Sequence, residues 1–399
     1  MATAAGVRAP TYDAHVERPL TATRLRERVN SVDVVRGLAM VLMAIDHVRV
    51  YSGQPAGGPT PGIFFTRWVT HFVAPAFVFL AGTSAYLRGE SLGSRGALSR
   101  FLLARGAWLV LLELTVLRFA WTFNADWSHY LLAGVIWMLG WCMILMAGLV
   151  RLPVKAVGAA GVAVVALHNL IPPSSGAAFG PLWPVLYGGG PVPGTPLLVL
   201  FVLVPWIGVM MAGYAFGAVM RLPADRRRAV CLRLGAALTV AFVVLRALDV
   251  YGDPRPWHAH GPMPAALAFH ATTKYPASLL FLLMTMGPVI AALGLAERWR
   301  GRAADVLATF GRVPLFYYLL HIPLIHLAAC VVSLVRTGSV SPWLFTNHPM
   351  APGPLPNGYR WSLPLLYLVF AICVTALYVP CRWFARVRAA RRSSWLSFL

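Results

Sequence analysis

The amino-acid sequence predicts an all-α integral membrane protein, a bundle of about ten transmembrane helices. Of its 399 residues, 58% are hydrophobic and only 12% are charged, and the mean hydropathy is +0.68. Soluble domains do not have this composition. The apolar stretches are long, whereas a membrane barrel would show short strands of alternating polarity, so helices are the predicted spanning element.

Apolar stretches close to the length that crosses a bilayer recur along the chain. They lie approximately at residues 31–50, 66–87, 100–123, 129–150, 153–171, 197–220, 230–249, 276–296, 313–335 and 362–384. We therefore expect one transmembrane domain at 31–386, an N-terminal tail at 1–30 and a basic C-terminal tail at 387–399. The N-terminal tail has no apolar core before the first predicted helix, which argues against a cleaved signal peptide.

The formal net charge is +21, from 34 basic and 13 acidic residues. In a soluble chain this charge would suggest nucleic-acid binding. Here most basic residues fall in alternate segments, namely 1–30, 88–105, 151–155, 221–233, 297–312 and 382–399. The positive-inside rule therefore predicts that both termini are cytoplasmic and that the chain lies in an inner (plasma) membrane. The five cysteines have no metal-binding spacing, and neither a metal nor a nucleic acid is a predicted partner.

The first predicted helix carries an unusual number of ionisable side chains, Asp33, Arg36, Asp46, His47 and Arg49. Such groups are costly inside a membrane and mark function unless a partner neutralises them. Arg36 and His47 are separated by about three helical turns, so both lie on one face, about 16 Å apart along the axis. Two structural alternatives stay open: an ion pair of Arg36 with Asp33, and a hydrogen-bonded interior histidine at position 47.

An anion-binding group and a reactive group at this separation suit acyl-CoA, which has phosphates at one end and a thioester on an extended arm. We expect acetyl-CoA or another acyl-CoA as a co-substrate, with no permanently bound cofactor. Arg36, Arg105 and Arg312 are the predicted phosphate ligands. Histidine 47 would act as base or nucleophile, and Glu113, the carboxylate in the core of the third helix, could orient its imidazole.

Other polar side chains are predicted at a similar depth in the outer half of the membrane and suggest a polar cavity that binds the acceptor. They are Asp46, Arg67, Arg118, His168, Lys274 and His321. Positions 321 and 326 are both histidines, but five residues apart they point in different directions on a helix. We expect one of them to face the cavity and the other to pack, rather than both to bind one metal.

Four stretches resemble a known family. SVDVVRGLAMVLMAIDH (31–47), THFVAPAFVFLAGTSAYL (70–87), TTKYPASLLFLLMTMGP (272–288) and GRVPLFYYLLHIPLIHL (311–327) are similar to bacterial relatives of heparan-alpha-glucosaminide N-acetyltransferase. The spacing from Arg36 to His47 also resembles the signature of the wider membrane acyltransferase superfamily that O-acetylates cell-surface polysaccharides. The resemblance implies transmembrane acetyl transfer, with His47 as the catalytic residue.

The sequence departs from the family pattern at one important place. In the animal lysosomal enzyme the position that matches His47 resembles asparagine, and the catalytic histidine lies in the loop after the first core helix. The corresponding loop here, 51–65, contains no histidine. His71 in the next helix is therefore the second candidate for the base, and heparan sulfate is not implied as the substrate.

The predicted function is a membrane acyltransferase that moves an acetyl or other acyl group from cytoplasmic acyl-CoA to an extracytoplasmic sugar or glycan. Its expected partners are the lipid bilayer, acyl-CoA and this acceptor; a homodimer stays open, as does the choice between N- and O-acylation. The alternative is a multi-pass transporter that uses the buried charges as a proton or substrate pathway.

Overall fold

The computed structural model describes residues 29–58, 60–259, 263–349 and 353–390. Its α-helices are α1 (Asn30–Ser52), α2 (Pro61–Trp68), α3 (Val73–Leu92), α4 (Arg95–Leu112), α5 (Arg118–Thr122), α6 (Val135–Leu149), α7 (Val154–Leu167), α8 (Gly176–Phe179), α9 (Trp206–Phe216), α10 (Ala224–Leu248), α11 (Ala265–His270), α12 (Leu279–Ala296), α13 (Arg302–Arg312), α14 (Pro314–Thr337) and α15 (Leu363–Ala390).

Shorter elements connect these helices. They are the 3-10 turns η1 (Val69–Phe72), η3 (His168–Leu170), η4 (Pro173–Ser175), η5 (Gly180–Leu182), η7 (Val219–Arg221), η8 (Trp257–Ala259) and η9 (Pro342–Phe345), the π-helical turns η2 (Glu113–Leu117) and η6 (Pro184–Gly188), and the strands β1 (Leu131–Ala133), β2 (Gly190–Pro191) and β3 (Leu197–Val199). The predicted N-terminal tail at 1–30 lies almost entirely outside the described residues. Helix α15 continues into the predicted C-terminal tail as far as Ala390.

Five helical segments are long and apolar enough to cross a membrane: 61–92, α10, α12, α14 and α15. Helix α6 and the segment 154–170 are apolar but shorter. These segments confirm a helical membrane protein, while the number of spans and the orientation of the termini stay predictions. Helix α1 has a sufficient length of 23 residues, but it carries the charged side chains already noted.

Two predicted helices begin later than expected, because a small sheet precedes them. The strand order is β1-β3-β2, with β1 parallel and β2 antiparallel to β3. The prediction of a helix over 197–220 was therefore wrong for its first part: the helix begins at Trp206, directly after Pro205. A proline disfavours helical backbone in the residue before it, which separates the strand from the helix. Within the described residues, this small sheet departs from the predicted all-α class.

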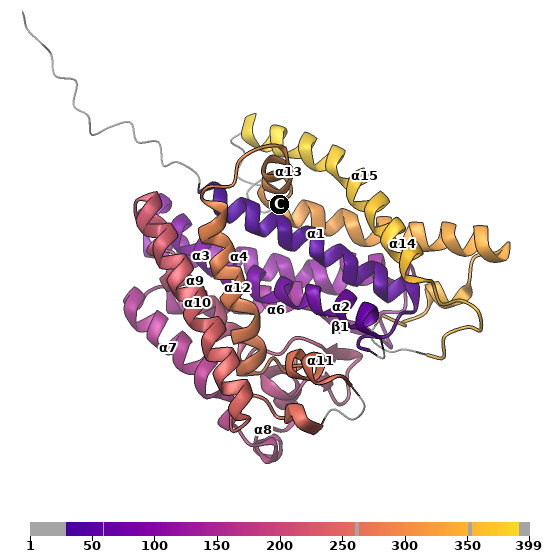
Figure 1. Ribbon diagram of the computed structural model, residues 1–399, viewed down its shortest axis with the longest axis horizontal. Helices are drawn as coiled ribbons and strands as arrows, with labels where there is room; N and C mark the ends of the chain where they lie inside the picture. Colours follow the sequence, from indigo (N-terminus) through magenta and orange to yellow (C-terminus); the bar gives the residue numbers. More distant parts are fainter. Residues whose placement is uncertain (1–28, 59, 260–262, 350–352, 391–399) are drawn as a thin grey trace, which may run out of the picture.

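Helix α1 lies at the centre of the bundle (Figure 1). It packs against α3, α12, α13, α14 and α15, so its side chains meet groups from distant parts of the sequence. Asp33 in its first turn and Arg49 in its last turn are favourably placed for the helix dipole. Gly53, with φ of 71°, ends the helix in the left-handed conformation that favours glycine.

The crossing of α1 and α13 depends on two glycines. A Cβ atom at Gly37 would lie 1.8 Å from the backbone oxygen of Leu307, and one at Gly311 would lie 1.8 Å from the backbone oxygen of Asp33. No larger side chain fits without separating the helices. This contact places the C-terminal end of α13 beside the first turns of α1, where Arg36 begins the candidate site.

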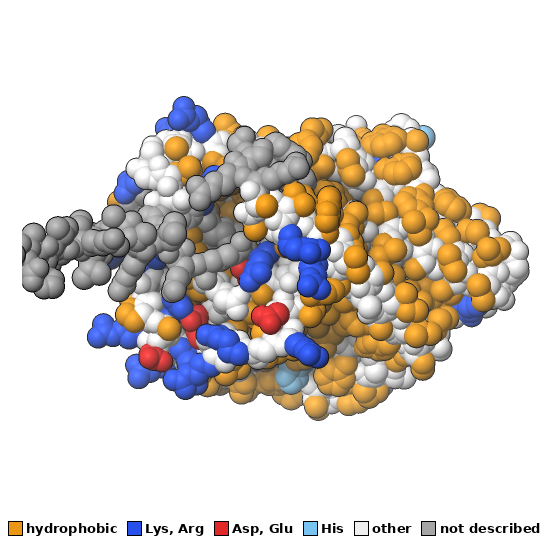
Figure 2. Space-filling model, turned by 90° about the horizontal axis from the view of Figure 1, so that it is seen from above, with side chains coloured by type: hydrophobic (Ala, Val, Ile, Leu, Met, Phe, Trp, Pro, Cys, Tyr) orange, Lys and Arg blue, Asp and Glu red, His pale blue; other side chains and the backbone are white. Residues whose placement is uncertain are grey.

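Lipid contact accounts for the apolar outer surface of the bundle. Exposed hydrophobic side chains follow α10, α14 and α15, including Val240, Leu248, Val331, Ile372 and Val379. Figure 2 shows the molecule from above, relative to Figure 1. Basic side chains gather over part of the visible face, and hydrophobic side chains cover much of the rest. This division is expected for a protein whose sides face lipid and whose ends face water.

Candidate functional site

Two cavities lie along α1. The first, the His47 cavity, has a volume of about 480 Å³ and is lined by polar side chains that include Asp46, His47, Arg49, Arg67, Glu113, Lys274, Tyr275, Tyr318 and His348. The second, the arginine cavity, has a volume of about 320 Å³ and is lined by Arg36, Arg88, Arg105, Arg312 and Arg388 among apolar residues. Of the described lining residues, only Tyr318 belongs to both cavities. Arg36 and His47 thus line two different cavities along the same helix, and the roles predicted for them stay predictions.

His47 pairs with a second histidine from α14. Its Nδ1 atom lies 2.6 Å from Nε2 of His321, and the two rings are stacked with centroids 4.8 Å apart. Nδ1 of His321 lies 2.7 Å from the backbone oxygen of Tyr318. Trp121 packs edge-on against the His47 ring at 4.7 Å, which fixes the plane of the imidazole.

These contacts determine where the protons of the neutral pair lie. A carbonyl oxygen only accepts, so Nδ1 of His321 carries a hydrogen and its Nε2 carries a lone pair. That lone pair accepts a hydrogen bond from Nδ1–H of His47, and Nε2 of His47 is left as a lone pair. In the described part of the chain no protein group hydrogen-bonds to this Nε2 atom. The pair therefore presents a proton acceptor at the His47 cavity.

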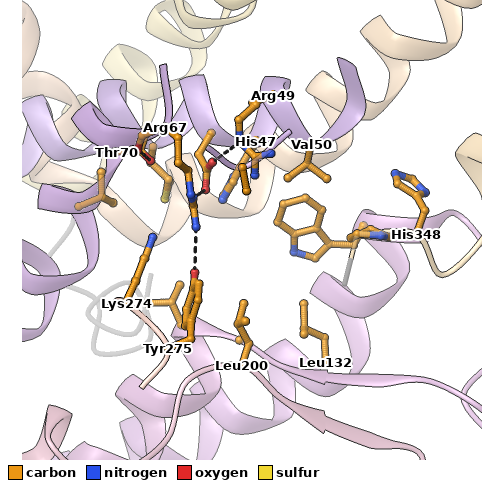
Figure 3. A pocket seen from close by; sticks show the side chains of 18 of the residues that line it. His47, Arg49, Val50, Arg67, Thr70, Leu132, Leu200, Lys274, Tyr275 and His348 are labelled. Atoms are coloured by element: carbon orange, nitrogen blue, oxygen red, sulfur yellow. Dashed lines mark hydrogen bonds and ion pairs between the residues drawn. The ribbon is translucent and has the colours of Figure 1, made fainter. Parts of the chain in front are cut away.

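A charged network lies beside His47 (Figure 3). Arg49 donates from Nε to Oδ1 of Asp46 at 2.8 Å, and Arg67 donates to Oδ2 of the same carboxylate. Arg67 also contacts the hydroxyl of Tyr275 at 3.4 Å. Both oxygens of Asp46 are thus used by arginines rather than by the adjacent imidazole.

Lys274 reaches the His47 cavity from the segment between α11 and α12. Asp253 fixes this segment: its carboxylate accepts from the backbone N–H of Thr273 at 2.8 Å and from the hydroxyl of Ser278 at 2.7 Å. Asn169 accepts from the backbone N–H of Leu279 at 2.8 Å at the start of α12. Although Lys274 lies outside a regular helix, its backbone is therefore firmly held.

Glu113 has a different role from the one predicted. Its carboxylate accepts a hydrogen bond from the backbone N–H of Ile136 at 3.1 Å, so it caps the N-terminus of α6 from the neighbouring helix. The predicted pairing of Glu113 with His47 was wrong, because the free N–H groups of α6 attract this carboxylate and His321 occupies the position beside the imidazole. Glu113 nevertheless lines the His47 cavity.

Arg36 contacts three groups of the described chain beside the arginine cavity. Its guanidinium lies 3.5 Å from Asp33, donates to the hydroxyl oxygen of Ser84 at 2.7 Å and donates to the backbone oxygen of Gly311 at 3.2 Å. The ion pair with Asp33, left open as an alternative, therefore exists together with the cavity position. No aspartate or glutamate is among the described residues that line this cavity. The lining is suited to a polyanion.

Several predicted site residues lie elsewhere in the described structure. Arg118 donates to the backbone oxygens of Tyr130, Asn124 and Asp126 at 2.6–3.1 Å, a structural role at the end of α5. His168 contacts the hydroxyl of Tyr187 at 3.3 Å. His71 packs against Phe281. His326 packs between Phe123 and Tyr51, as expected for one of the two histidines at 321 and 326. Arg118, His168 and His71 line neither cavity. The sequence could not reveal this, because the rotation of each helix about its own axis decides which side chains face a cavity.

Sequence reasoning missed four residues that matter to the geometry. Tyr318, Tyr275, Arg88 and Arg388 line the cavities but were not selected. The signal was available for the tyrosines, since each lies close to a selected residue: Tyr275 follows Lys274, and Tyr318 lies one turn before His321 on α14. Tyrosine is common at membrane interfaces, so it carries little signal by itself.

The fold and the two cavities define a helical membrane protein with a histidine pair at a polar cavity and a second cavity that is lined by arginines. A family model described as heparan-alpha-glucosaminide N-acetyltransferase, catalytic, matches residues 28–251. The chain belongs to this family, and it is thereby assigned to the acetyltransferases. Arg36, His47, Arg67 and Glu113 lie inside the matched range. Comparison with curated proteins finds none that matches the chain.

Proposed function

We propose that the protein transfers an acetyl or other acyl group from cytoplasmic acyl-CoA to an extracytoplasmic sugar or glycan, in the inner membrane of the cell. The observation that carries this proposal is the position of Tyr318, which lines both the arginine cavity and the cavity of His47. A substrate held by its phosphates in the arginine cavity would have to pass this side chain to reach the histidine.

The arginine cavity would hold the nucleotide end of acyl-CoA. Five guanidinium groups line it, and arginine is well suited to phosphate because its planar donors can bind two oxygens at once. Arg88, Arg105 and Arg312 belong to the segments that the positive-inside rule assigns to the cytoplasm, where acyl-CoA is made. The apolar residues of the same cavity, such as Met40 and Phe77, suit the pantetheine arm.

His47 would act as the general base. Its Nε2 atom takes the proton from the acceptor hydroxyl or amine as the acceptor attacks the thioester carbonyl carbon. The carbon–sulfur bond then breaks, and the imidazolium returns the proton to the leaving thiolate. His321 supports the charged intermediate state of the ring, because its Nε2 lone pair already accepts from Nδ1–H of His47.

The hydroxyl of Tyr318 would donate to the oxyanion that forms on the thioester oxygen. The Tyr318 ring lies edge-on to His47, with centroids 6.2 Å apart, and the residue is 3% exposed. Donors placed where negative charge develops are a large source of rate acceleration in acyl transfer. The acceptor would enter the His47 cavity from the extracytoplasmic side.

The test is binding and turnover of radiolabelled acetyl-CoA by the purified protein in detergent. Water can replace the unknown acceptor, so hydrolysis is a sufficient readout of the chemistry. We expect the wild type to bind and hydrolyse acetyl-CoA, His47→Ala to bind without turnover, and Arg36→Ala to bind more weakly. Absence of binding by a folded wild type would refute the proposal and leave the transporter alternative. Burst kinetics would indicate that His47 itself is acylated rather than acting as base.

A further inference from the structure

The His47 cavity contains more positive than negative charge. Arg49, Arg67 and Lys274 line it together with two carboxylates, Asp46 and Glu113. His348 adds no charge near neutral pH, because burial lowers its pKa to about 4. Even with both carboxylates ionised, one positive charge is therefore left over at the cavity wall.

The excess charge can be assigned to Lys274. Both oxygens of Asp46 are used by Arg49 and Arg67, and the carboxylate of Glu113 caps α6. Lys274 forms no ion pair with a carboxylate in the described part of the chain. Its Nζ atom lies 5.3 Å from the centre of the Tyr275 ring, and the residue is only 9% exposed.

An ammonium group in this environment is unfavourable unless an anion joins it. Burial, and after it the neighbouring Arg67 guanidinium, lower the pKa of Lys274, as expected where no anion fully compensates its charge. The segment that carries Lys274 is nevertheless fixed by Asp253, so the chain holds this cation in place at a cost. Figure 3 shows Lys274 and Tyr275 directed toward Arg67 across one end of the cavity.

We infer that the acceptor carries an acidic group, a carboxylate or a phosphate, which binds between Lys274 and Arg67 while the reacting hydroxyl or amine lies against His47. The substrate class is thus an acidic sugar, in the form of a sugar acid or a sugar phosphate. The inference rests on the proposed function for the identity of the reacting group, but not for the binding of the anion. Arg67 would hold the anion with the donors that Asp46 leaves available.

The experiment measures dissociation constants of glucose, glucuronate and glucose 6-phosphate for the purified protein without acetyl-CoA. The three probes share one ring and differ in their acidic group. We expect both anions to bind at least about tenfold more tightly than glucose, as one charge-assisted contact provides. The anion that binds more tightly then identifies the carboxylate or the phosphate as the acidic group of the acceptor.

Substitutions of lysine test whether the anions bind at this site. The chain contains only two lysines, so the second one serves as the control. Lys274→Met should remove the preference for anions, Lys274→Arg should keep it, and Lys155→Met, an exposed control, should leave it unchanged. Equal binding of all three probes, failure of both anions to bind, or a preference that survives in Lys274→Met would overturn the inference. The last result would mean that the anions bind in the arginine cavity.

The outcome is separable from that of the proposed function. Anion binding that depends on Lys274 in a protein that binds no acetyl-CoA would keep the anion site and reject acyl transfer. Acetyl-CoA hydrolysis without any anion preference would keep acyl transfer and reject the acidic acceptor. If Lys274→Met fails to fold, Lys274→Gln is the second uncharged variant: it should likewise lose the preference for anions, and a preference that survives in it would overturn the inference.

Discussion

The arginine cavity and the His47 cavity are neighbours on α1, but their charges are organised in different ways. In the arginine cavity, five guanidinium groups line the wall, and Asp33 lies 3.5 Å from Arg36. In the His47 cavity, Asp46 forms ion pairs with two arginines, whereas Lys274 has no carboxylate partner among the described residues. The first arrangement suits a ligand with several negative charges, and the second suits a ligand with one.

The two cavities also differ in what they can do chemically. The arginine cavity contains guanidinium groups, which do not exchange protons near neutral pH. The His47 cavity contains a neutral imidazole with a free lone pair, oriented by a second imidazole. Under the proposed function, binding and chemistry would lie in separate cavities that share Tyr318, and substitutions should affect one without the other.

The largest effect is expected for His47→Ala. Removing the base should reduce turnover of acetyl-CoA by roughly 10²–10⁴-fold, the usual contribution of general base catalysis, while acetyl-CoA binding stays within about twofold of the wild type. Steady-state rates and a filter-binding assay measure the two quantities. His129→Ala is the control, since this histidine is exposed and forms an ion pair only with Asp126 on the surface. A variant that loses binding as strongly as turnover would contradict the separation of the cavities.

The next effect is expected at the residue shared by the cavities. Tyr318→Phe removes one donor to the oxyanion, and we expect kcat to fall by roughly 10²-fold with little change in KM. Tyr317→Phe is the matched control, because the adjacent hydroxyl is buried without a hydrogen-bond partner in the described structure and its loss should not reduce stability or activity. Equal rates for the two variants would show that Tyr318 lines the cavities without donating to the oxyanion.

Some residues of these cavities could be predicted from the sequence, but their partners from other helices could not. The ionisable residues of α1 could be selected because a charge inside an apolar stretch is conspicuous, and their helical spacing placed Arg36 and His47 on one face. The partner of His47 could not be found, because the approach of α1 and α14 depends on packing between residues separated by 274 positions. Glu113 was misassigned for a similar reason: its helix-capping contact with Ile136 is tertiary.

The membrane segments were more predictable than the site. Each predicted apolar stretch contains a helix, because apolar length alone determines it. The predicted helix was wrong at residues 197–205. There β3 pairs with β1, and α9 begins only after Pro205. Helices α3 and α9 approach each other closely at a small residue: a Cβ atom at Gly82 would lie 2.1 Å from the backbone oxygen of Met210.

A smaller effect is expected for the second histidine. His321→Gln keeps a polar side chain but does not reproduce the fixed chain of donors from His47 to the Tyr318 carbonyl. We expect turnover to fall by roughly 10–100-fold, as for other groups that orient a reacting side chain. The profile of rate against pH should also move, because His321 stabilises the charged form of His47. An unchanged profile together with a reduced rate would indicate a purely structural role.

The smallest effect is expected in the arginine cavity, where the charges are several and partly exposed. The side chain of Arg312 is 47% exposed and lies 4.0 Å from Asp33, so solvent screens part of its attraction for a phosphate. Arg312→Gln should therefore weaken acetyl-CoA binding by only about three- to tenfold, with an unchanged kcat. Acetyl-pantetheine, which lacks the nucleotide phosphates, distinguishes this cause from misfolding: its turnover should be the same in the variant and the wild type. If Arg312→Gln impaired both substrates equally, the arginine cavity would not be the phosphate site, and the division between a binding cavity and a chemical cavity would fail.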